Sequence, residues 1–252
     1  MAWNPEKYNE FKALRYKPFF DLVAHIVDKP NMKVIDLGCG TGELTHMLSE
    51  RLTNPSVKGI DSSKEMLEKA KKFTSIQFDP KTIEEQINTG EKWDLIFANA
   101  SIQWVDNHQE LFPKIISLLN SDGQLAIQMP CQNENLLNQI VIKLVQEEPY
   151  KSALNNWKRL SPVLSMDDYA QILFENGGTD ILIYQKVYPM IASSHDQLYE
   201  FILGSTLVPY FERLKGEIKE QFIKEFKIRI AKRFSKTPSL YAFKRILLYA
   251  KF

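Results

Sequence analysis

The sequence predicts an α/β protein with a mostly parallel β-sheet that is covered by helices on both faces. From residue 33 to residue 129, short apolar and β-branched runs alternate with stretches in which apolar residues recur at helical spacing. This alternation is typical of parallel sheets, because each strand is followed by a crossover helix. The chain has 252 residues, 44% of them hydrophobic and 25% charged, which is enough for one large domain of this class.

Five runs in the first half of the chain have the character of buried strands. The run KVIDL is short, apolar and β-branched, and WDLIFANA is the clearest of the five. Turn residues follow each run, such as the SDG that precedes QLAIQM. The predicted strands are residues 33–37, 57–61, 75–78, 93–100 and 124–129.

Helices are predicted between these strands. Apolar residues recur at helical spacing from Leu44 to Leu52 and again over residues 109–120. Between them, Ser63 is a residue type that caps helix N-termini, so a helix is expected to begin just after it.

The pattern changes after residue 130. Residues 131–165 are polar and helical, and a capping box at Ser165 and Asp168 begins a further helix that is expected to end near Gly177. Residues 180–188 form a predicted strand, and residues 195–234 are mostly helical. The last residues are expected to add an antiparallel strand beside the core sheet.

Composition excludes several classes of protein. Lys plus Arg is 32 and Asp plus Glu is 31, so a net charge of +1 argues against nucleic acid or an anionic membrane as the main partner. The N-terminus lacks the pattern of a signal peptide and no apolar run reaches the ~20 residues of a membrane span, so a cytoplasmic location is expected. Cys39 and Cys131 are far apart and outside any metal-ligand spacing, so no metal is expected.

Three glycines follow the first predicted strand. Gly38, Gly40 and Gly42 form G-x-G-x-G, which is neither the G-x-G-x-x-G of dinucleotide sites nor a P-loop, since GK[ST] is absent. Each glycine costs backbone entropy on folding, so something is expected to approach this backbone more closely than a Cβ would allow. In open α/β sheets, ligands bind at this edge, beyond the carboxyl ends of the strands.

Two carboxylates accompany the glycine loop. Asp36 precedes it and would repel a pyrophosphate but attract an ammonium group. Asp61 ends the second predicted strand, where an acid can accept both hydroxyls of a ribose. An ammonium, a close backbone and a ribose diol together fit S-adenosylmethionine better than a nicotinamide cofactor.

The motifs DLGCGTG and GIDSS..ML resemble the class I S-adenosylmethionine-dependent methyltransferases, and among them most closely the trans-aconitate 2-methyltransferases. The stretches that carry the resemblance include WNPEKY, FKALRYKP, DLIFANASIQWVDNHQELFP, LLNSDGQLAIQMP and FKRILLYAK. The resemblance implies a Rossmann-like fold with a seven-stranded sheet, in a single domain of residues 1–252. Its expected parts are N-terminal lid helices (1–30), a cofactor-binding core (31–130), a helical cap (131–176 and 195–236) and closing strands (180–190 and 240–252).

The resemblance also implies roles for individual residues toward S-adenosylmethionine. Thr82 stands where the family usually has an acid that faces the adenine amino group. The implied contacts are Asp36, Gly38, Cys39 and Gly40 for the methionine part, Asp61 for the ribose, Ser62, Met66, Thr82 and Ile83 for the adenine, Asn99 and Ala100 near the sulfonium, and Trp3, Tyr8 and Arg15 from the lid.

The methyl acceptor is expected above the end of the fourth predicted strand. Gln103, Trp104 and His108 would position it, although Trp104 could be plain packing and His108 could cap the helix that follows. No strong base stands in this stretch, which favours a carboxylate acceptor that is already ionised. Further candidates for the acceptor pocket, each of which could instead be a surface charge or a core aromatic, are Trp157, Arg159, Tyr210, Lys244 and Arg245.

These expectations amount to an O-methyltransferase that esterifies a small carboxylic acid, with trans-aconitate as the best named substrate. Val208 stands where the family has an arginine, and a tricarboxylate is best held by fixed cations. Two alternatives stay open: a methyltransferase acting on malonyl-carrier protein, with the Lys-rich segment 215–236 facing an acidic carrier, and a protein that binds S-adenosylmethionine without catalysis. The sequence does not indicate an oligomeric state.

Overall fold

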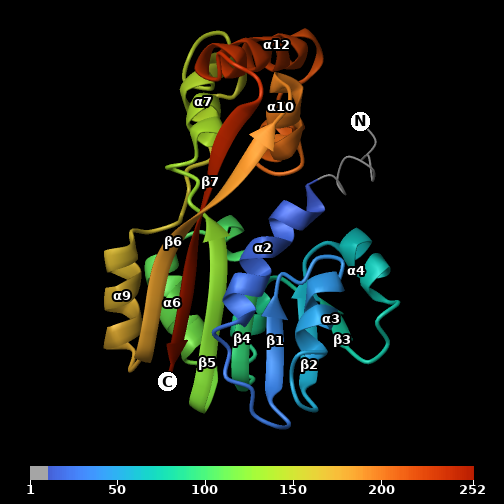
Figure 1. Cartoon of the computed structure of the whole chain (residues 1–252), viewed down its shortest axis with the longest axis vertical. Coiled ribbons are helices and arrows are strands. Elements are labelled where there is room, and N and C mark those ends of the chain that lie inside the picture. The colour runs from blue at the N-terminus through green and yellow to red at the C-terminus, as the bar shows by residue number, and fades with distance from the viewer. Residues whose placement is uncertain (1–10) are drawn as a thin grey trace. The chain divides into compact units, whose positions relative to one another are not determined.

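The computed structural model describes residues 11–252 and contains one seven-stranded sheet in the order β3-β2-β1-β4-β5-β7-β6 (Figure 1). The strands β1 to β5 are parallel to one another, and β7 runs antiparallel to β5. The strand order reverses between β1 and β4, which is where ligands bind in folds of this type. The strands are β1 (Lys33–Leu37), β2 (Ser56–Asp61), β3 (Gln77–Pro80), β4 (Trp93–Asn99), β5 (Leu119–Pro130), β6 (Thr179–Ala192) and β7 (Ser239–Lys251).

This architecture confirms the mostly parallel seven-stranded sheet and the antiparallel C-terminal strand. Two details differ. The third strand lies two residues later than expected, at Gln77–Pro80, and β5 begins at Leu119 rather than at residue 124. The early start of β5 coincides with a register shift against β4 between Trp93 and Leu95.

One face of the sheet is covered by α2 (Lys12–Val23) and α3 (Glu43–Ser49). Phe19 and Leu22 of α2 and Leu48 of α3 are fully buried in one apolar cluster with side chains from the sheet. The sheet side chains in this cluster alternate along each strand, as the two-residue period of a strand requires. They include Val34, Val57, Leu95, Phe97, Ala126, Leu247 and Tyr249.

The opposite face carries α6 (His108–Ile116) and α9 (Met166–Glu175), which pack against each other. Tyr169 of α9 is fully buried and lies 3.9 Å from the sulfur of Met129, whose side chain points away from the face of Ala126. Helices therefore lie on both faces of the sheet, as predicted. The shorter helices that follow β2, β3 and β4 are α4 (Lys64–Ala70), α5 (Ile83–Ile87) and the 3-10 turn η1 (Ile102–Trp104).

The chain forms two compact units. The first, with residues 16–130, 162–186 and 245–252, holds β1 to β5 together with residues 179–186 of β6 and 245–251 of β7. Among the described residues, the second consists of residues 11–15, 131–161 and 187–244. Its own apolar core is built from aromatic and aliphatic residues of helices and of the remaining parts of β6 and β7. Its helices are α7 (Leu136–Leu144), α8 (Tyr150–Ala153), α10 (His195–Leu203), α11 (Val208–Arg213) and α12 (Gly216–Arg233).

Two segments group differently from the expected domain plan. Helix α9 was expected in the cap, but it belongs to the unit of the sheet, where Tyr169 is buried against Phe112 of α6 and Met129 of β5. Residues 16–23, expected in the lid, also belong to that unit, since Phe19 and Leu22 are part of its core. Helix α9 begins where the local sequence predicts, because Ser165 and Asp168 form its capping box.

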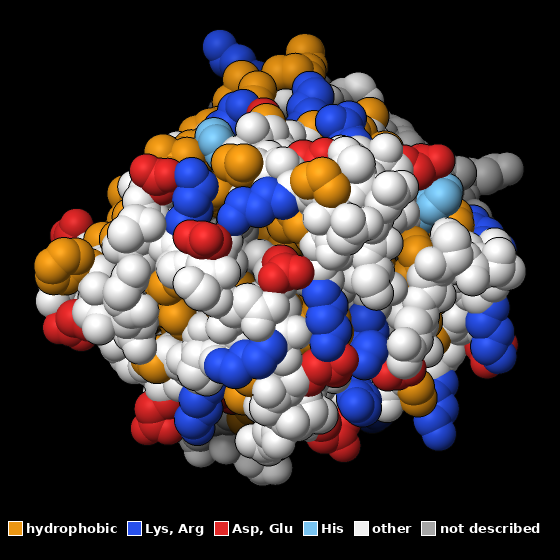
Figure 2. All heavy atoms as spheres, turned by 90° about the horizontal axis from the view of Figure 1, so that it is seen from below, with side chains coloured by type: hydrophobic (Ala, Val, Ile, Leu, Met, Phe, Trp, Pro, Cys, Tyr) orange, Lys and Arg blue, Asp and Glu red, His pale blue; other side chains and the backbone are white. Residues whose placement is uncertain are grey.

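Within residues 11–252, no helix has the length and apolar character needed to cross a bilayer. The face shown in Figure 2 carries Lys and Arg side chains interspersed with Asp and Glu side chains, and neither sign dominates it. This mixture agrees with the net charge of +1.

Candidate functional site

The residues predicted to hold a cofactor follow the carboxyl ends of four neighbouring parallel strands. The glycine loop follows β1, Asp61 ends β2 and Ser62 follows it, Thr82 follows β3, and Asn99 ends β4. Because β3, β2, β1 and β4 are adjacent in this order, all of these groups lie along one edge of the sheet. The topology thus brings together residues that are up to 63 positions apart in the chain, from Asp36 to Asn99.

The glycine loop has a left-handed backbone, and its glycines are required for different reasons. A Cβ on Gly38 would lie 2.3 Å from Cβ of Ser101, and one on Gly42 would lie 2.7 Å from the Phe78 ring. A Cβ on Gly40 would meet nothing within 4 Å. Close approach was expected throughout the loop; at Gly38 and Gly42 it is made by the protein itself, and only Gly40 faces open space.

Asp61 holds the glycine loop against the end of β2. Its Oδ2 accepts a hydrogen bond from the N–H of Gly40 at 2.9 Å, and its Oδ1 accepts one from the N–H of Ser63 at 2.8 Å. A carboxylate can accept about four hydrogen bonds, so each oxygen keeps a lone pair for a hydroxyl group. Asp61 therefore has the acceptors that a ribose diol needs, beside the open space at Gly40.

Asp36 is a buried carboxylate with one unsatisfied oxygen. Its side chain is 2% exposed, Oδ2 accepts a 2.6 Å hydrogen bond from Thr45, and Oδ1 has no hydrogen-bond partner. Burial raises the pKa of Asp36 to about 7, and the charge of Asp61 adds to the shift while the Thr45 bond opposes it. Burial also raises the pKa of the Cys39 thiol, helped by the charges of Asp36 and Asp61. Such a site favours a cationic ligand, because a positive charge would compensate the buried carboxylate.

The raised pKa predicts how stability depends on pH. Because the folded protein keeps the Asp36 proton up to about pH 7 while the unfolded chain releases it near 3.8, the stabilisation is complete below pH 3.8 and is lost as the pH rises through 7. The slope from this group is at most about 1.4 kcal/mol per pH unit. Urea unfolding at pH 5, 6, 7 and 8 should show this fall in the wild-type protein, and Asp36→Asn should lack it. If the free energy of unfolding varied with pH in the same way in both proteins, the raised pKa of Asp36 would be contradicted.

A layer of polar side chains crosses the sheet next to the apolar cluster. Asp36, Asn99, Gln128 and Arg245 lie on the neighbouring strands β1, β4, β5 and β7, on the face covered by α2 and α3. We call these four residues the polar layer. On each strand, the residue two positions away on the same face belongs to the apolar cluster: Val34, Phe97, Ala126 and Leu247.

The predicted adenine contacts follow β2 and β3. Ser62 is exposed, and Met66 on α4 is an exposed apolar side chain. Thr82 caps α5 and forms a capping box with Glu85: its hydroxyl accepts from the N–H of Glu85 at 3.1 Å. Ile83 is buried at the first turn of the same helix. Thr82 thus has a structural task, and its hydroxyl keeps one lone pair and its proton.

The segment after β4 is held close to the glycine loop. Ala100 has a left-handed backbone with φ of 59°, and its N–H donates to the carbonyl of Gln128 at 2.9 Å. The hydroxyl of Ser101 donates to the carbonyl of Leu37. Gln103 is buried and donates to the carbonyl of Ala100 at 2.7 Å, whereas the Trp104 side chain is exposed. Trp104 is therefore more accessible to an acceptor than Gln103.

His108 has a different place from the one predicted. It is 1% exposed, with Nε2 3.1 Å from the carbonyl oxygen of Ile102 and Nδ1 2.5 Å from the hydroxyl of Tyr169. A carbonyl oxygen only accepts, so Nε2 donates and Nδ1 accepts from Tyr169. Both ring nitrogens are used inside the fold, so His108 links η1 to α9 and leaves no nitrogen for a substrate.

Three of the predicted acceptor contacts come together in the second unit. The rings of Trp157 and Tyr210 meet edge to face at 5.3 Å, and the hydroxyl of Tyr210 accepts from the N–H of Arg159 at 3.2 Å. Lys244 lies in the same unit, with Nζ 3.7 Å from the carboxylate of Glu134. Arg245 is buried in the polar layer instead of facing solvent as a free cation would.

Of the predicted lid residues, Arg15 lies at the N-terminal end of the described chain, in α2. Arg15 donates to the carbonyl of Phe201 at 2.9 Å and lies over its ring, so this residue is anchored on α10. Trp3 and Tyr8 lie outside the described residues.

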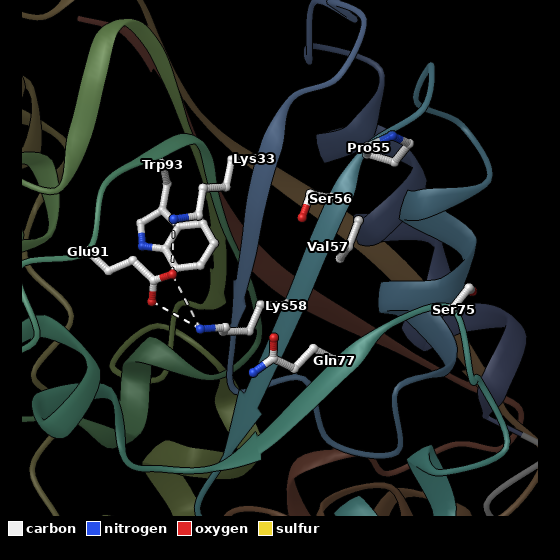
Figure 3. A pocket seen from close by; sticks show the side chains of 9 residues that line it. All are labelled: Lys33, Pro55, Ser56, Val57, Lys58, Ser75, Gln77, Glu91 and Trp93. Atoms are coloured by element: carbon white, nitrogen blue, oxygen red, sulfur yellow. Dashed lines mark hydrogen bonds and ion pairs between the residues drawn. The ribbon is translucent and has the colours of Figure 1, made fainter.

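A separate pocket of about 420 Å³ lies at the amino ends of the strands, the edge opposite to the candidate site (Figure 3). Glu91 pairs with both Lys33 and Lys58 at 3.0 Å, and the Lys33 ammonium lies 4.5 Å from the centre of the Trp93 ring. Both lysines of the pocket are thus held in ion pairs, since Lys58 Nζ also lies 3.8 Å from the carboxylate of Asp79.

Sequence reasoning missed two polar residues of the site. Thr45 supports Asp36, and Gln128 contacts Asn99. The signal for Gln128 was present, since a polar residue in the apolar run QLAIQM requires a partner when it is buried. Within residues 11–252, no group of three or more His, Cys, Asp or Glu side chains is placed to hold a metal ion.

The residues at this edge fit S-adenosylmethionine on three structural observations. Oδ1 of Asp36 is buried without a hydrogen-bond partner, and a cationic ligand could supply one. Asp61 has lone pairs left for a diol, and Gly40 faces open space. Chemically, this arrangement can hold a cationic nucleoside and desolvate its charged group.

Comparisons with known proteins point in the same direction. Residues 28–191 match a family model described as a methyltransferase domain. The chain is 34% identical to trans-aconitate 2-methyltransferase of Deinococcus radiodurans, over 99% of this chain and 98% of that protein. It is 31% identical to the Escherichia coli K12 protein of the same name, over 99% and 98% of the two chains.

Solved structures share the fold. A crystal structure of the YcgJ protein from Bacillus subtilis superposes with a TM-score of 0.62 at 16% identity, covering 94% of this chain and 98% of that one. A putative methyltransferase from Bacillus halodurans gives 0.58 at 16% identity, covering 92% and 97%. At this level of identity the likeness concerns the fold alone.

Proposed function

This chain belongs to the methyltransferase-domain family and is an S-adenosylmethionine-dependent methyltransferase, and from that premise we propose that it esterifies a carboxylate of a small polycarboxylic acid, with trans-aconitate as the first candidate. The observation that carries this proposal is the full-length identity of 34% to a protein named trans-aconitate 2-methyltransferase. A third relative of that name, from Variovorax paradoxus, is 28% identical over 100% of this chain.

When bound, S-adenosylmethionine supplies a methyl group on a sulfonium that is already a good leaving group. The protein then has to position and desolvate the reactants, and alignment alone can contribute about 7–11 kcal/mol. Asp36 would balance positive charge in the buried end of the site, Asp61 would hold the ribose, and Met66 would cover the adenine. Asn99, at the end of β4, would lie between the sulfonium and the acceptor, and Trp104 in η1 would face the acceptor.

The chemistry proposed for the acceptor agrees with the described segment 99–108, which offers no available base. The titratable side chains of the segment 99–108 are Asp106, which is exposed, and His108, whose ring nitrogens are both bonded within the fold. A carboxylate needs no base, because it is ionised at neutral pH and attacks through an oxygen lone pair. The new O–C bond forms as the C–S bond breaks, and no proton has to move.

A turnover assay tests the proposal. Purified protein with S-adenosylmethionine should convert trans-aconitate to a monomethyl ester, detected by mass spectrometry together with S-adenosylhomocysteine. The acid panel should include cis-aconitate, citrate, isocitrate and a monocarboxylate control. Methyl esters of none of these acids, from a protein that binds S-adenosylmethionine, would overturn the small-acid proposal. Methylation of malonyl-carrier protein in the same assay would then support the carrier-borne alternative.

A further inference from the structure

Three members of the polar layer form a chain of hydrogen bonds across three strands. Asn99 and Gln128 are direct neighbours on β4 and β5, and Arg245 on β7 lies diagonally across from Gln128. Arg245 Nη1 is 2.6 Å from Oε1 of Gln128, and Nε2 of Gln128 is 2.5 Å from Oδ1 of Asn99. Gln128 is fully buried and Arg245 nearly so, so these bonds are shielded from water.

The direction of each bond is fixed by the arginine. A guanidinium has five donors and no acceptor, so the group of Gln128 that faces Arg245 has to be its oxygen. The Gln128 NH₂ group is thereby turned toward Asn99 and requires an acceptor there. Asn99 meets it with Oδ1, which leaves its own NH₂ group as the outward-facing end of the side chain.

We propose that Arg245 and Gln128 are positioning residues that orient the Asn99 amide so that it presents a hydrogen-bond donor to the carboxylate of the methyl acceptor. Asn99 is half-buried at the carboxyl end of β4, beside the left-handed turn at Ala100 and at the point where the strand order reverses. A donor at this place favours an anionic acceptor, whereas an amide oxygen there would repel it. Arg245 thus affects the substrate through the side-chain amides of Gln128 and Asn99 and does not contact the substrate itself. The substrate part of this inference rests on the proposed function; the orientation of Asn99 does not.

Gln128→Glu is the variant that reverses the chain. A carboxylate at this position only accepts, so it would bond to Arg245 and also to the NH₂ group of Asn99, which must then turn its oxygen outward. The new charge faces Arg245, so the fold should be retained. In NMR spectra, the side-chain NH₂ signal of Asn99, assigned by its loss in Asn99→Asp, should show solvent exchange at least tenfold slower in Gln128→Glu than in the wild type. Unchanged exchange would overturn the proposed orientation without any assay of activity.

Steady-state kinetics with trans-aconitate test the role toward substrate. Gln128→Glu and Arg245→Met should each raise the KM for the acid at least tenfold, leave kcat within about threefold, and leave the Kd for S-adenosylmethionine within about twofold. Arg245→Lys, which keeps a donor for Gln128, should restore most of the loss. A structural defect alone would lower kcat and the affinity for S-adenosylmethionine as well, and that result would overturn the proposal.

Two controls complete the experiment. Lys251→Met removes a cation from the other end of β7, where Lys251 pairs with Asp180, and should leave KM unchanged. Gln124→Glu adds a carboxylate at another fully buried position of β5, and reports the general effect of a new charge in that strand. If solvent exchange of the Asn99 NH₂ signal slows as expected but no acid is methylated, the orientation of Asn99 holds and the proposed substrate class fails.

Discussion

Asp61→Ala is expected to raise the Kd for S-adenosylmethionine by a factor of about 100 or more. Hydrogen bonds to a charged group contribute about 1.5–3 kcal/mol each, and a ribose diol would make two of them. The variant also loses the bonds from the N–H groups of Gly40 and Ser63, which hold the glycine loop and the start of α4. Isothermal titration calorimetry on the folded variant measures the effect directly.

The loss of ribose contacts can be separated from loosening of the loop with a 2′-deoxy analogue of S-adenosylhomocysteine. The wild-type protein should bind this analogue at least tenfold more weakly than S-adenosylhomocysteine, whereas Asp61→Ala should hardly distinguish the two. Asp79→Ala provides the matched control, because Asp79 lies on the neighbouring strand β3 and its carboxylate pairs with Lys58. A Kd within threefold of the wild-type value in Asp61→Ala would contradict the whole cofactor assignment.

Gly38→Ala is expected to destabilise the protein more than any other single change in the glycine loop. Its Cβ would lie 2.3 Å from Cβ of Ser101, on a backbone with φ of +80°. Strain at such a backbone costs about 1–3 kcal/mol and overpacking about 1–3 kcal/mol more, so a total of roughly 3 kcal/mol or above is expected. Thermal unfolding should show a fall in Tm of at least about 6 °C.

Gly40→Ala supplies the contrast. Its φ is +56° but its Cβ would meet nothing within 4 Å, so the cost to stability should be about 1–2 kcal/mol. The added methyl group would instead occupy the space assigned to the cofactor, and the affinity for S-adenosylmethionine should fall at least tenfold. Equal stability of Gly38→Ala and Gly40→Ala would contradict the different roles given to the two glycines. An unchanged affinity of Gly40→Ala for S-adenosylmethionine would contradict them as well.

The alternating strands, and the edge of the sheet on which the candidate site lies, could be predicted from the sequence because each rests on local chemistry. KVIDL forms β1 with the predicted bounds, since it is a β-branched apolar run closed by a glycine. Ser63 caps α4 as predicted, accepting from the N–H of Met66. The first residues of β5 were not predicted, because Asn120, Ser121, Asp122 and Gly123 have the composition of a turn.

What could not be predicted depends on contacts between residues distant in the chain. His108 looked available to a substrate until Tyr169, 61 positions away, was seen to fill its Nδ1. Arg245 was predicted as a cation of the acceptor pocket, and the pairing of β5 with β7 instead buries it beside Gln128. The order of strands is a property of the whole chain, so no window of local sequence contains it.

The position of β7 also determines when the sheet can be completed during synthesis on the ribosome. In the finished sheet, β7 lies between β5 and β6, although it is the last strand to be translated (Figure 1). The N-terminal part of a chain leaves the ribosome first and can fold first, so β1 to β5 can assemble early. At that stage β6 still lacks β7, the strand beside which it lies in the finished sheet. A nascent chain halted before residue 239 would thus expose the edges of both β5 and β6, two hydrogen-bonding edges of the kind that promote aggregation.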